Sequence, residues 1–307
     1  MALIVLTSAS GSPGATTTAV GLALAWPRPV VLVEADPTGG SPVLAGYFRG
    51  TVAPDRGLID LALAHRDGHV AAAPPGTLMP IPTSAPIPAH LPNPGPDPVT
   101  VRERGAWLLP GIRGHAQARS LTPVWEPLAD AFTGLERNGQ DVIVDAGRLG
   151  LTGSPGPLIR GGDLTLLTVR TDLVSLSGAR AWAQTLREDH ETAGATGTLG
   201  LLLIGEKRPY AAGDVSKVLG LPVAAGLAWD PVAAAVFCHG ATPARRFSTG
   251  QPTSTLSHAR ARNAEPARWC RTLRAGSVQR RRGRRRPRDP MPCGGPRRPP
   301  RRARPGS

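Results

Sequence analysis

The chain has 307 residues, 40% of them hydrophobic, which is enough for one large α/β domain or two small ones. Its three cysteines are far apart and predict neither a disulfide framework nor a zinc site. There is no run of about 18 apolar residues that would span a membrane. The short apolar start lacks the basic residues of a signal peptide, so a cytoplasmic protein is expected.

The net charge of +14 is concentrated at the C-terminal end of the sequence. Residues 276–307 contain twelve Arg and one Asp, a charge of +11, so residues 1–275 carry only +3. The segment before this end, residues 251–275, is expected to be helical or irregular. Residues 276–307 are rich in Arg, Pro and Gly without apolar periodicity, which predicts a disordered basic tail.

Such a tail predicts non-specific, salt-dependent binding to DNA, RNA or an anionic membrane. It has no interleaved aromatic residues and no recognition helix, so there is no specific nucleic-acid motif. Binding of this kind would place the protein at the periphery of the membrane or nucleoid. The alternative is an artefact, because a GC-rich gene read in the wrong frame also yields Arg, Pro and Gly.

Strands and helices alternate from the beginning of the chain. A short apolar run at 2–6 is followed by a loop of Ser, Gly and Pro at 8–14. A helical pattern at 16–26 and a second apolar run at 30–33 come next. This spacing predicts a βαβ unit with parallel strands and a right-handed crossover.

After a helix expected at 58–65, residues 71–100 contain ten prolines and predict a solvated, extended insertion without a helix or central strand. Regular patterns then return. Further strands are expected at 106–109, 141–145, 164–169, 199–204 and 221–227, and further helices at 121–135, 175–187, 211–219 and 231–238. The alternation predicts an α/β fold with a doubly wound, mostly parallel sheet and helices on both faces.

The loop after the first strand is suited to binding an anion. It reads Ser10, Gly11, Ser12, Pro13, Gly14, Ala15, Thr16 and Thr17. Its glycines permit close backbone approach, and its N–H groups and the following helix N-terminus favour negative charge. Asp36 follows the second strand and Asp145 ends the strand at 141–145. A threonine hydroxyl with carboxylates from neighbouring strand ends is how such sheets bind Mg²⁺ beside phosphates.

The order and spacing of these motifs resemble the ParA/MinD group of deviant Walker-A ATPases, including the CpaE/TadZ-like proteins of pilus and secretion systems. The loop of that family reads KGGxGK[ST]T. In this register Ser10 stands at the signature lysine and Ala15 at the Walker lysine. The loop is therefore a degenerate P-loop that lacks both lysines. The resemblance covers residues 1–250, with residues 71–100 as an insertion.

Two further motifs of the family match in order: Glu34 and Asp36 its D-x-D-P motif, and Asp145 its Walker-B aspartate. The resemblance implies a P-loop NTPase-like fold, ATP and Mg²⁺ as ligands, and a homodimer. The nucleotide-binding residues that it implies are Gly11, Ser12, Pro13, Gly14, Ala15, Thr16 and Thr17. It also implies Thr16, Asp36 and Asp145 as metal ligands and Asp36 as the catalytic residue.

The departures from the family predict at most a weak ATPase. Loss of one donor that stabilises developing charge typically costs roughly 100-fold or more in rate. The adenine-contacting Asn after the strand at 199–204 is replaced by Gly205 and Glu206. Arg148 and Lys207 are the candidates for a replacement positive charge.

Three functions stay open at this point. The first is a nucleotide-binding positioning protein for chromosome partitioning, septum siting or a secretion or pilus system, with a secretion or pilus ATPase as partner. The second is a pseudo-ATPase scaffold that no longer binds nucleotide. The third is non-specific nucleic-acid binding through the tail.

Simpler interpretations apply to single residues. The loop glycines are also typical of a tight turn, Asp36 of an Asp-Pro turn and Asp145 of a capped strand end. The histidines show no spacing that indicates a metal or catalytic site, and are expected at the surface: His65, His69, His190 and His239. Ser8 and Ser10 form no G-x-S-x-G elbow, so a hydrolase triad is not supported.

Overall fold

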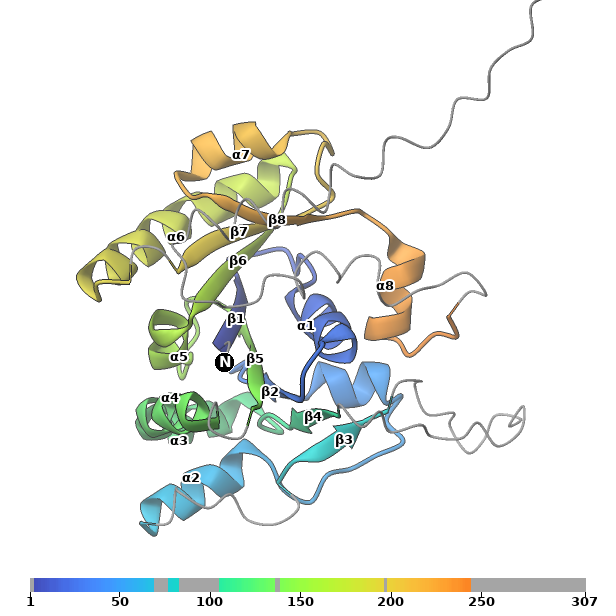
Figure 1. Ribbon diagram of the computed structural model, residues 1–307, viewed down its shortest axis with the longest axis vertical. Helices are drawn as coiled ribbons and strands as arrows, with labels where there is room; N and C mark the ends of the chain where they lie inside the picture. Colours follow the sequence, from blue (N-terminus) through green and yellow to red (C-terminus); the bar gives the residue numbers. More distant parts are fainter. Residues whose placement is uncertain (1–2, 69–76, 83–104, 136–138, 196–197, 244–307) are drawn as a thin grey trace, which may run out of the picture.

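The computed structural model describes residues 3–68, 77–82, 105–135, 139–195 and 198–243. They form an eight-stranded sheet with helices on both faces (Figure 1), in the order β3-β4-β2-β5-β1-β6-β7-β8. All neighbouring strands are parallel except β3 and β4, which are antiparallel. The doubly wound, mostly parallel α/β fold expected from the sequence is confirmed.

The strands are β1 (Leu3–Ser8), β2 (Val30–Glu34), β3 (Met79–Ile81), β4 (Ala106–Leu109), β5 (Asp141–Arg148), β6 (Leu164–Arg170), β7 (Leu199–Ile204) and β8 (Val223–Leu227). The α-helices are α1 (Ala15–Ala25), α2 (Leu58–Arg66), α3 (Ala118–Leu121), α4 (Trp125–Gly134), α5 (Gly156–Gly161), α6 (Leu173–Thr192), α7 (Ala212–Leu219) and α8 (Pro231–Cys238). Three short turns of other helix types are η1 (Val43–Tyr47), η2 (His115–Gln117) and η3 (Thr122–Val124). No helix among these is both long and apolar enough to cross a membrane.

Each face of the sheet buries an apolar cluster. One cluster lies beneath α2 to α7, and the other beneath α1, η1 and α8, on the opposite side in Figure 1. Along β1, Leu3 and Val5 belong to the first cluster, whereas Ile4 and Leu6 belong to the second. Because a parallel strand covered on both faces buries side chains on each side, the central strands are nearly continuous apolar runs in the sequence.

Part of the proline-rich segment belongs to the fold, which corrects the expectation of a wholly solvated insertion. Met79–Ile81 pairs with β4 at the edge of the sheet, where Pro80 is tolerated because only one side of the strand is bonded. Ile81 is buried, and the Tyr47 hydroxyl donates to the Pro82 carbonyl at 2.7 Å. Residues 71–76, 83–100, 251–275 and 276–307 lie outside the described part of the chain.

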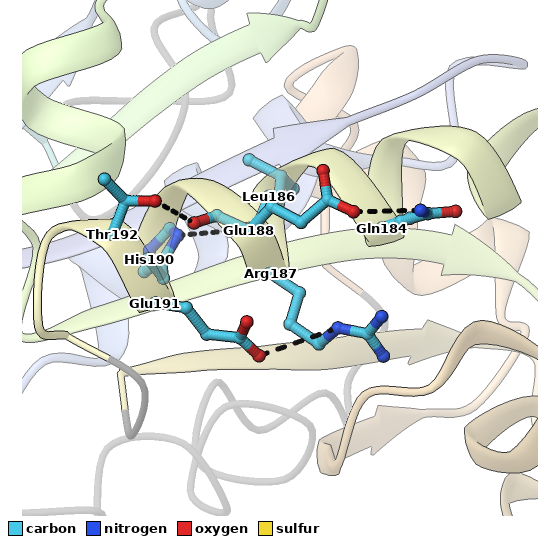
Figure 2. A network of polar contacts seen from close by, with 7 residues as sticks. All are labelled: Gln184, Leu186, Arg187, Glu188, His190, Glu191 and Thr192. Carbon is cyan, nitrogen blue, oxygen red and sulfur yellow. Dashed lines mark hydrogen bonds and ion pairs between the residues drawn. The ribbon is translucent and has the colours of Figure 1, made fainter.

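His190 is buried rather than exposed, so the expectation for this residue was wrong. It lies near the end of α6 with 1% of its surface exposed, and its Nδ1 is 2.8 Å from the Leu186 carbonyl. Because it follows Leu186 by four residues, it lies on the stripe of α6 that packs against the sheet. Figure 2 shows the exposed polar pairs of the same turns, Gln184 with Glu188 and Arg187 with Glu191.

Candidate functional site

The loop between β1 and α1 leaves the sheet at its centre. β1 lies between β5 and β6, so the chain crosses first to one side of β1 and later to the other. In doubly wound sheets, ligands bind at the carboxyl ends of the strands where the strand order reverses in this way. The fold therefore places residues 10–17 where a ligand is expected.

The backbone of this loop is folded so that its N–H groups stay free. Gly11, Ser12 and Gly14 have positive φ angles of 72°, 44° and 107°, and Gly14 directly precedes α1. The first helical bond runs from the Thr18 N–H to the Gly14 carbonyl at 2.9 Å. In the described part of the chain, the N–H groups of residues 11, 12 and 14–17 donate to no protein acceptor. Free N–H groups at a helix N-terminus form an anion site.

Asp145 lies next to this loop on β5, in the core of the sheet. Asp145 is 1% exposed, and the Gly147 N–H donates to its Oδ1 at 3.2 Å. The Thr16 side chain is close enough to lower the pKa of the carboxyl, but it does not reach a well-aligned hydrogen bond. Within the described residues, the buried Oδ2 has no hydrogen-bond partner. A buried carboxylate oxygen of this kind is costly unless a cation or proton joins it.

The electrostatics of Asp145 also favour a cation. The pKa of Asp145 is raised to about 7: burial is the largest cause and the negative charges of Asp36 and Glu34 add to the rise, while Thr16 and the Gly147 N–H oppose it. A bound divalent cation would reverse this balance because it stabilises the carboxylate form.

Asp36, which follows β2, packs against the turn after Asp145. Its carboxylate accepts hydrogen bonds from the Thr38 N–H and hydroxyl, both at 2.8 Å. Gly147 has a φ of 64°, and a Cβ at this position would collide with the Asp36 carboxyl group. The absence of a side chain at Gly147 therefore lets Asp36 approach β5.

The structure thus brings Thr16, Asp36 and Asp145 together beside the loop. No group of three or more His, Cys, Asp or Glu side chains in the described ranges is arranged to hold a metal ion. A cation here would take two carboxylates, one hydroxyl and oxygens of a ligand, which fits Mg²⁺ beside phosphates. The roles of these residues as ligands stay a prediction.

Glu34, which matches the first acid of the D-x-D-P motif, is a structural residue here. Its carboxylate accepts from the Ser41 hydroxyl at 2.6 Å, the Val43 N–H at 3.1 Å and the Gly111 N–H at 3.3 Å. Burial raises the pKa of Glu34, and these hydrogen bonds oppose that rise. Glu34 therefore ties the end of β2 to the start of η1 and to the residues after β4.

Ser10 and Ala15, the two positions expected from the sequence to correspond to the family's lysines, are packed into the protein. Ala15 is 7% exposed and belongs to the apolar cluster beneath α1. The Ser10 hydroxyl lies against Gly178 of α6, where a Cβ would collide with it. Neither residue brings a positive charge to the loop.

Among the described residues, the cation that hydrogen-bonds to the loop is Arg170, which the sequence interpretation did not identify. It ends β6, and its Nη2 donates to the Ser12 carbonyl at 3.1 Å. Arg148 and Lys207, the candidates from the sequence, are exposed, and within the described residues neither side chain bonds to the loop. The available signal was position, because Arg170 is the last residue of a buried strand next to β1.

Comparison with proteins of known structure supports the doubly wound α/β fold described above. No protein-family model matches the chain, and no curated protein matches it in sequence. Among solved structures, the cell division ATPase MinD of Pyrococcus furiosus is similar with a TM-score of 0.55 and 18% identity, over 91% of this chain and 99% of that one. A ParA family ATPase from Chlorobium tepidum TLS has a TM-score of 0.54 and 16% identity, over 82% and 95%.

A third similar structure was determined with a nucleotide. It is the septum site-determining protein MinD from Pyrococcus horikoshii OT3 complexed with Mg-ADP, with a TM-score of 0.52, 17% identity and coverage of 90% of this chain and 95% of that one. At these identities the likeness concerns the fold. The chain therefore has the ParA/MinD-like P-loop ATPase fold.

Proposed function

We propose that this protein binds Mg-ATP at the β1–α1 loop and acts as a ParA/MinD-like positioning protein with weak or no ATP hydrolysis. The observation that carries the proposal is the free N–H groups of the loop beside Thr16, Asp36 and Asp145. The similarity to a MinD structure that contains Mg-ADP supports the choice of ligand.

In this proposal each part of the site has a distinct task. The N–H groups of residues 11, 12 and 14–17 donate to phosphate oxygens at the positive end of α1. Thr16, Asp36 and Asp145 hold the cation, which satisfies the partnerless Oδ2 of Asp145. Asp36, fixed by its two bonds from Thr38, is the candidate catalytic carboxylate. Bound Mg-ATP supplies the charge that distinguishes the two states of a nucleotide switch.

Weak hydrolysis follows from the missing lysines. A charged donor aimed at the transferring phosphoryl group is worth roughly 100-fold or more in rate, and Ala15 and Ser10 supply none. We expect Ala15→Lys to raise phosphate release above that of the wild type. Ala15→Arg and Ala15→Gln serve as size-matched controls, since neither reproduces a lysine point charge. A rate unchanged in Ala15→Lys with normal Mg-ATP binding would show that the rest of the catalytic site is absent.

Binding itself is tested by thermal unfolding of the full chain. A ligand at 100 times its dissociation constant stabilises by about 2.7 kcal/mol, which raises Tm by roughly 5 °C or more in a domain of this size. We expect Mg-ATP to raise Tm in the wild type, and Asp36→Ala and Asp145→Ala to reduce the increase. An unchanged Tm in wild-type protein at millimolar Mg-ATP would overturn the nucleotide-binding part of the proposal.

The pseudo-ATPase scaffold is the second candidate, because the packing of Ala15 and Ser10 leaves the loop without lysine charge. It predicts a cellular phenotype that is unaffected by Asp145→Ala. The oligomeric state, the protein partner and the cellular location also stay predictions. They are a homodimer, a secretion or pilus ATPase of the kind served by CpaE/TadZ-like proteins, and DNA or an anionic membrane bound by residues 276–307. Comparison of wild type and Asp145→Ala in a deletion strain separates the switch from the scaffold.

A further inference from the structure

Arg170 lies at the loop, in a position where neither the fold nor the packing requires a positively charged side chain. It is the last residue of β6, whose strand neighbour is β1, so its side chain starts at the same end of the sheet as the loop. Its Nη2 donates to the Ser12 carbonyl at 3.1 Å, across 158 residues of sequence. The guanidinium is therefore fixed beside the free N–H groups of residues 11, 12 and 14–17.

A second contact of the guanidinium is with an aromatic ring. The Cζ of Arg170 lies 5.0 Å from the ring centre of Trp229, in the segment after β8, and the Cζ of Arg208 lies 5.9 Å from the same ring. Guanidinium groups stack favourably on tryptophan, and such contacts orient them. The side chain is thus held in place in the free protein, which lowers the entropy cost of using it for a ligand.

The positive charge of Arg170 is not balanced by an ion pair among the described residues. Within the same residues, its buried Nε has no hydrogen-bond partner. The hydrogen bonds from Ser175 and, to a smaller extent, the charge of Arg170 lower the pKa of Asp172, the nearest acid along the chain, but the two side chains form no ion pair. A half-buried cation with unused donors costs free energy until an anion arrives.

We propose that Arg170 binds phosphate oxygens of the nucleotide and supplies the positive charge that Ser10 and Ala15 do not. This inference rests on the proposed function. One of the five N–H donors of the guanidinium bonds to Ser12, and the planar fork of the others matches the oxygens of a phosphate group. Because the acids Asp36 and Asp145 lie on the other side of β1, a polyphosphate bound at the loop needs a positive charge such as that of Arg170.

The test is calorimetric titration of the full chain with Mg-ATP. A hydrogen bond to a charged group contributes about 1.5–3 kcal/mol, so we expect Arg170→Ala to weaken binding on the order of 10-fold or more. Arg170→Lys keeps the charge but not the fork of N–H donors, so its affinity for Mg-ATP should lie between those of the wild type and Arg170→Ala. Arg148→Ala is the matched control, because it removes an exposed arginine at the end of β5, on the opposite side of β1.

Tryptophan fluorescence gives a second readout that does not depend on hydrolysis. Because Trp229 stacks on Arg170, Mg-ATP should change the emission of the wild type, and the change should be smaller in Trp229→Phe. If Arg170→Ala does not fold, Arg170→Gln replaces it, since glutamine keeps a donor without the charge.

Equal affinities of wild type and Arg170→Ala, or equal losses in Arg170→Ala and Arg148→Ala, would overturn the role of Arg170 and leave the proposed function standing. Absence of Mg-ATP binding by the wild type would overturn both.

Discussion

The replacement Asp145→Asn tests the electrostatics of the site in the metal-free protein. Burial raises the pKa of Asp145 from 3.8 to about 7. Because the folded pKa lies above the unfolded pKa, the folded state holds more protons between pH 4 and pH 7. The stability that the protonated Asp145 contributes is therefore fully present below pH 4 and is lost as the pH rises towards 7. A difference of about 3 pKa units corresponds to about 4 kcal/mol.

Asparagine cannot ionise, but it still accepts from the Gly147 N–H and occupies the same volume. We therefore expect the free energy of unfolding of Asp145→Asn, relative to the wild type, to rise by up to about 4 kcal/mol between pH 4 and pH 8. The assay is urea unfolding in EDTA, followed by circular dichroism. Parallel pH profiles of the two proteins would refute the reasoning.

A control with the opposite sign is Asp172→Asn. Hydrogen bonds from Ser175 lower the pKa of Asp172, so its carboxylate contributes stability above the unfolded pKa that is lost on acidification. Its variant should therefore lose stability, relative to the wild type, as the pH rises towards 4 from below, and the difference should stay constant at higher pH. If both variants shift in the same direction, a general effect of net charge explains the data instead.

Two further predictions concern residues that support the site. Gly147→Ala puts a methyl group into the Asp36 carboxyl at a positive φ. It should lower the free energy of unfolding, measured with urea, by about 1–3 kcal/mol, and weaken Mg-ATP binding in calorimetry. A variant with wild-type values in both assays would contradict this. Asp172→Ala removes the N-cap of α6, whose carboxylate accepts from the Ser175 N–H at 2.9 Å, and should cost about 1 kcal/mol at pH 7. This cost should decrease as the pH falls through the lowered pKa of Asp172, whereas a cost that does not change on acidification would argue against an ionised cap.

The fold was predictable because its signals are local. Strands buried on both faces are mostly apolar, so β1, β2, β5, β6 and β7 are recognisable as short, predominantly apolar runs. The carboxyl ends of these strands share one edge of the sheet, so the proximity of Asp36 and Asp145 to the loop also followed from the sequence.

What the sequence did not reveal depends on contacts between distant segments. β3 contains Pro80 and is only an edge strand, so its pairing with β4 has no local pattern. Arg170 reaches Ser12 only because β6 and β1 are neighbours. His190 is buried because α6 extends beyond its expected end at residue 187.

The central claim is that the loop binds a polyphosphate through a cation held by Asp145. The most direct measurement is calorimetric titration of the full chain and of Asp145→Ala with ATP, each with Mg²⁺ and with EDTA. The Arg-rich end of the sequence is unchanged in the variant, so binding of ATP to residues 276–307 contributes equally to both proteins. We predict one Mg²⁺-dependent site per chain in the wild type and its loss, or a weakening of roughly 10-fold or more, in Asp145→Ala. Identical titrations of the two proteins, or binding that is indifferent to Mg²⁺, would contradict the account.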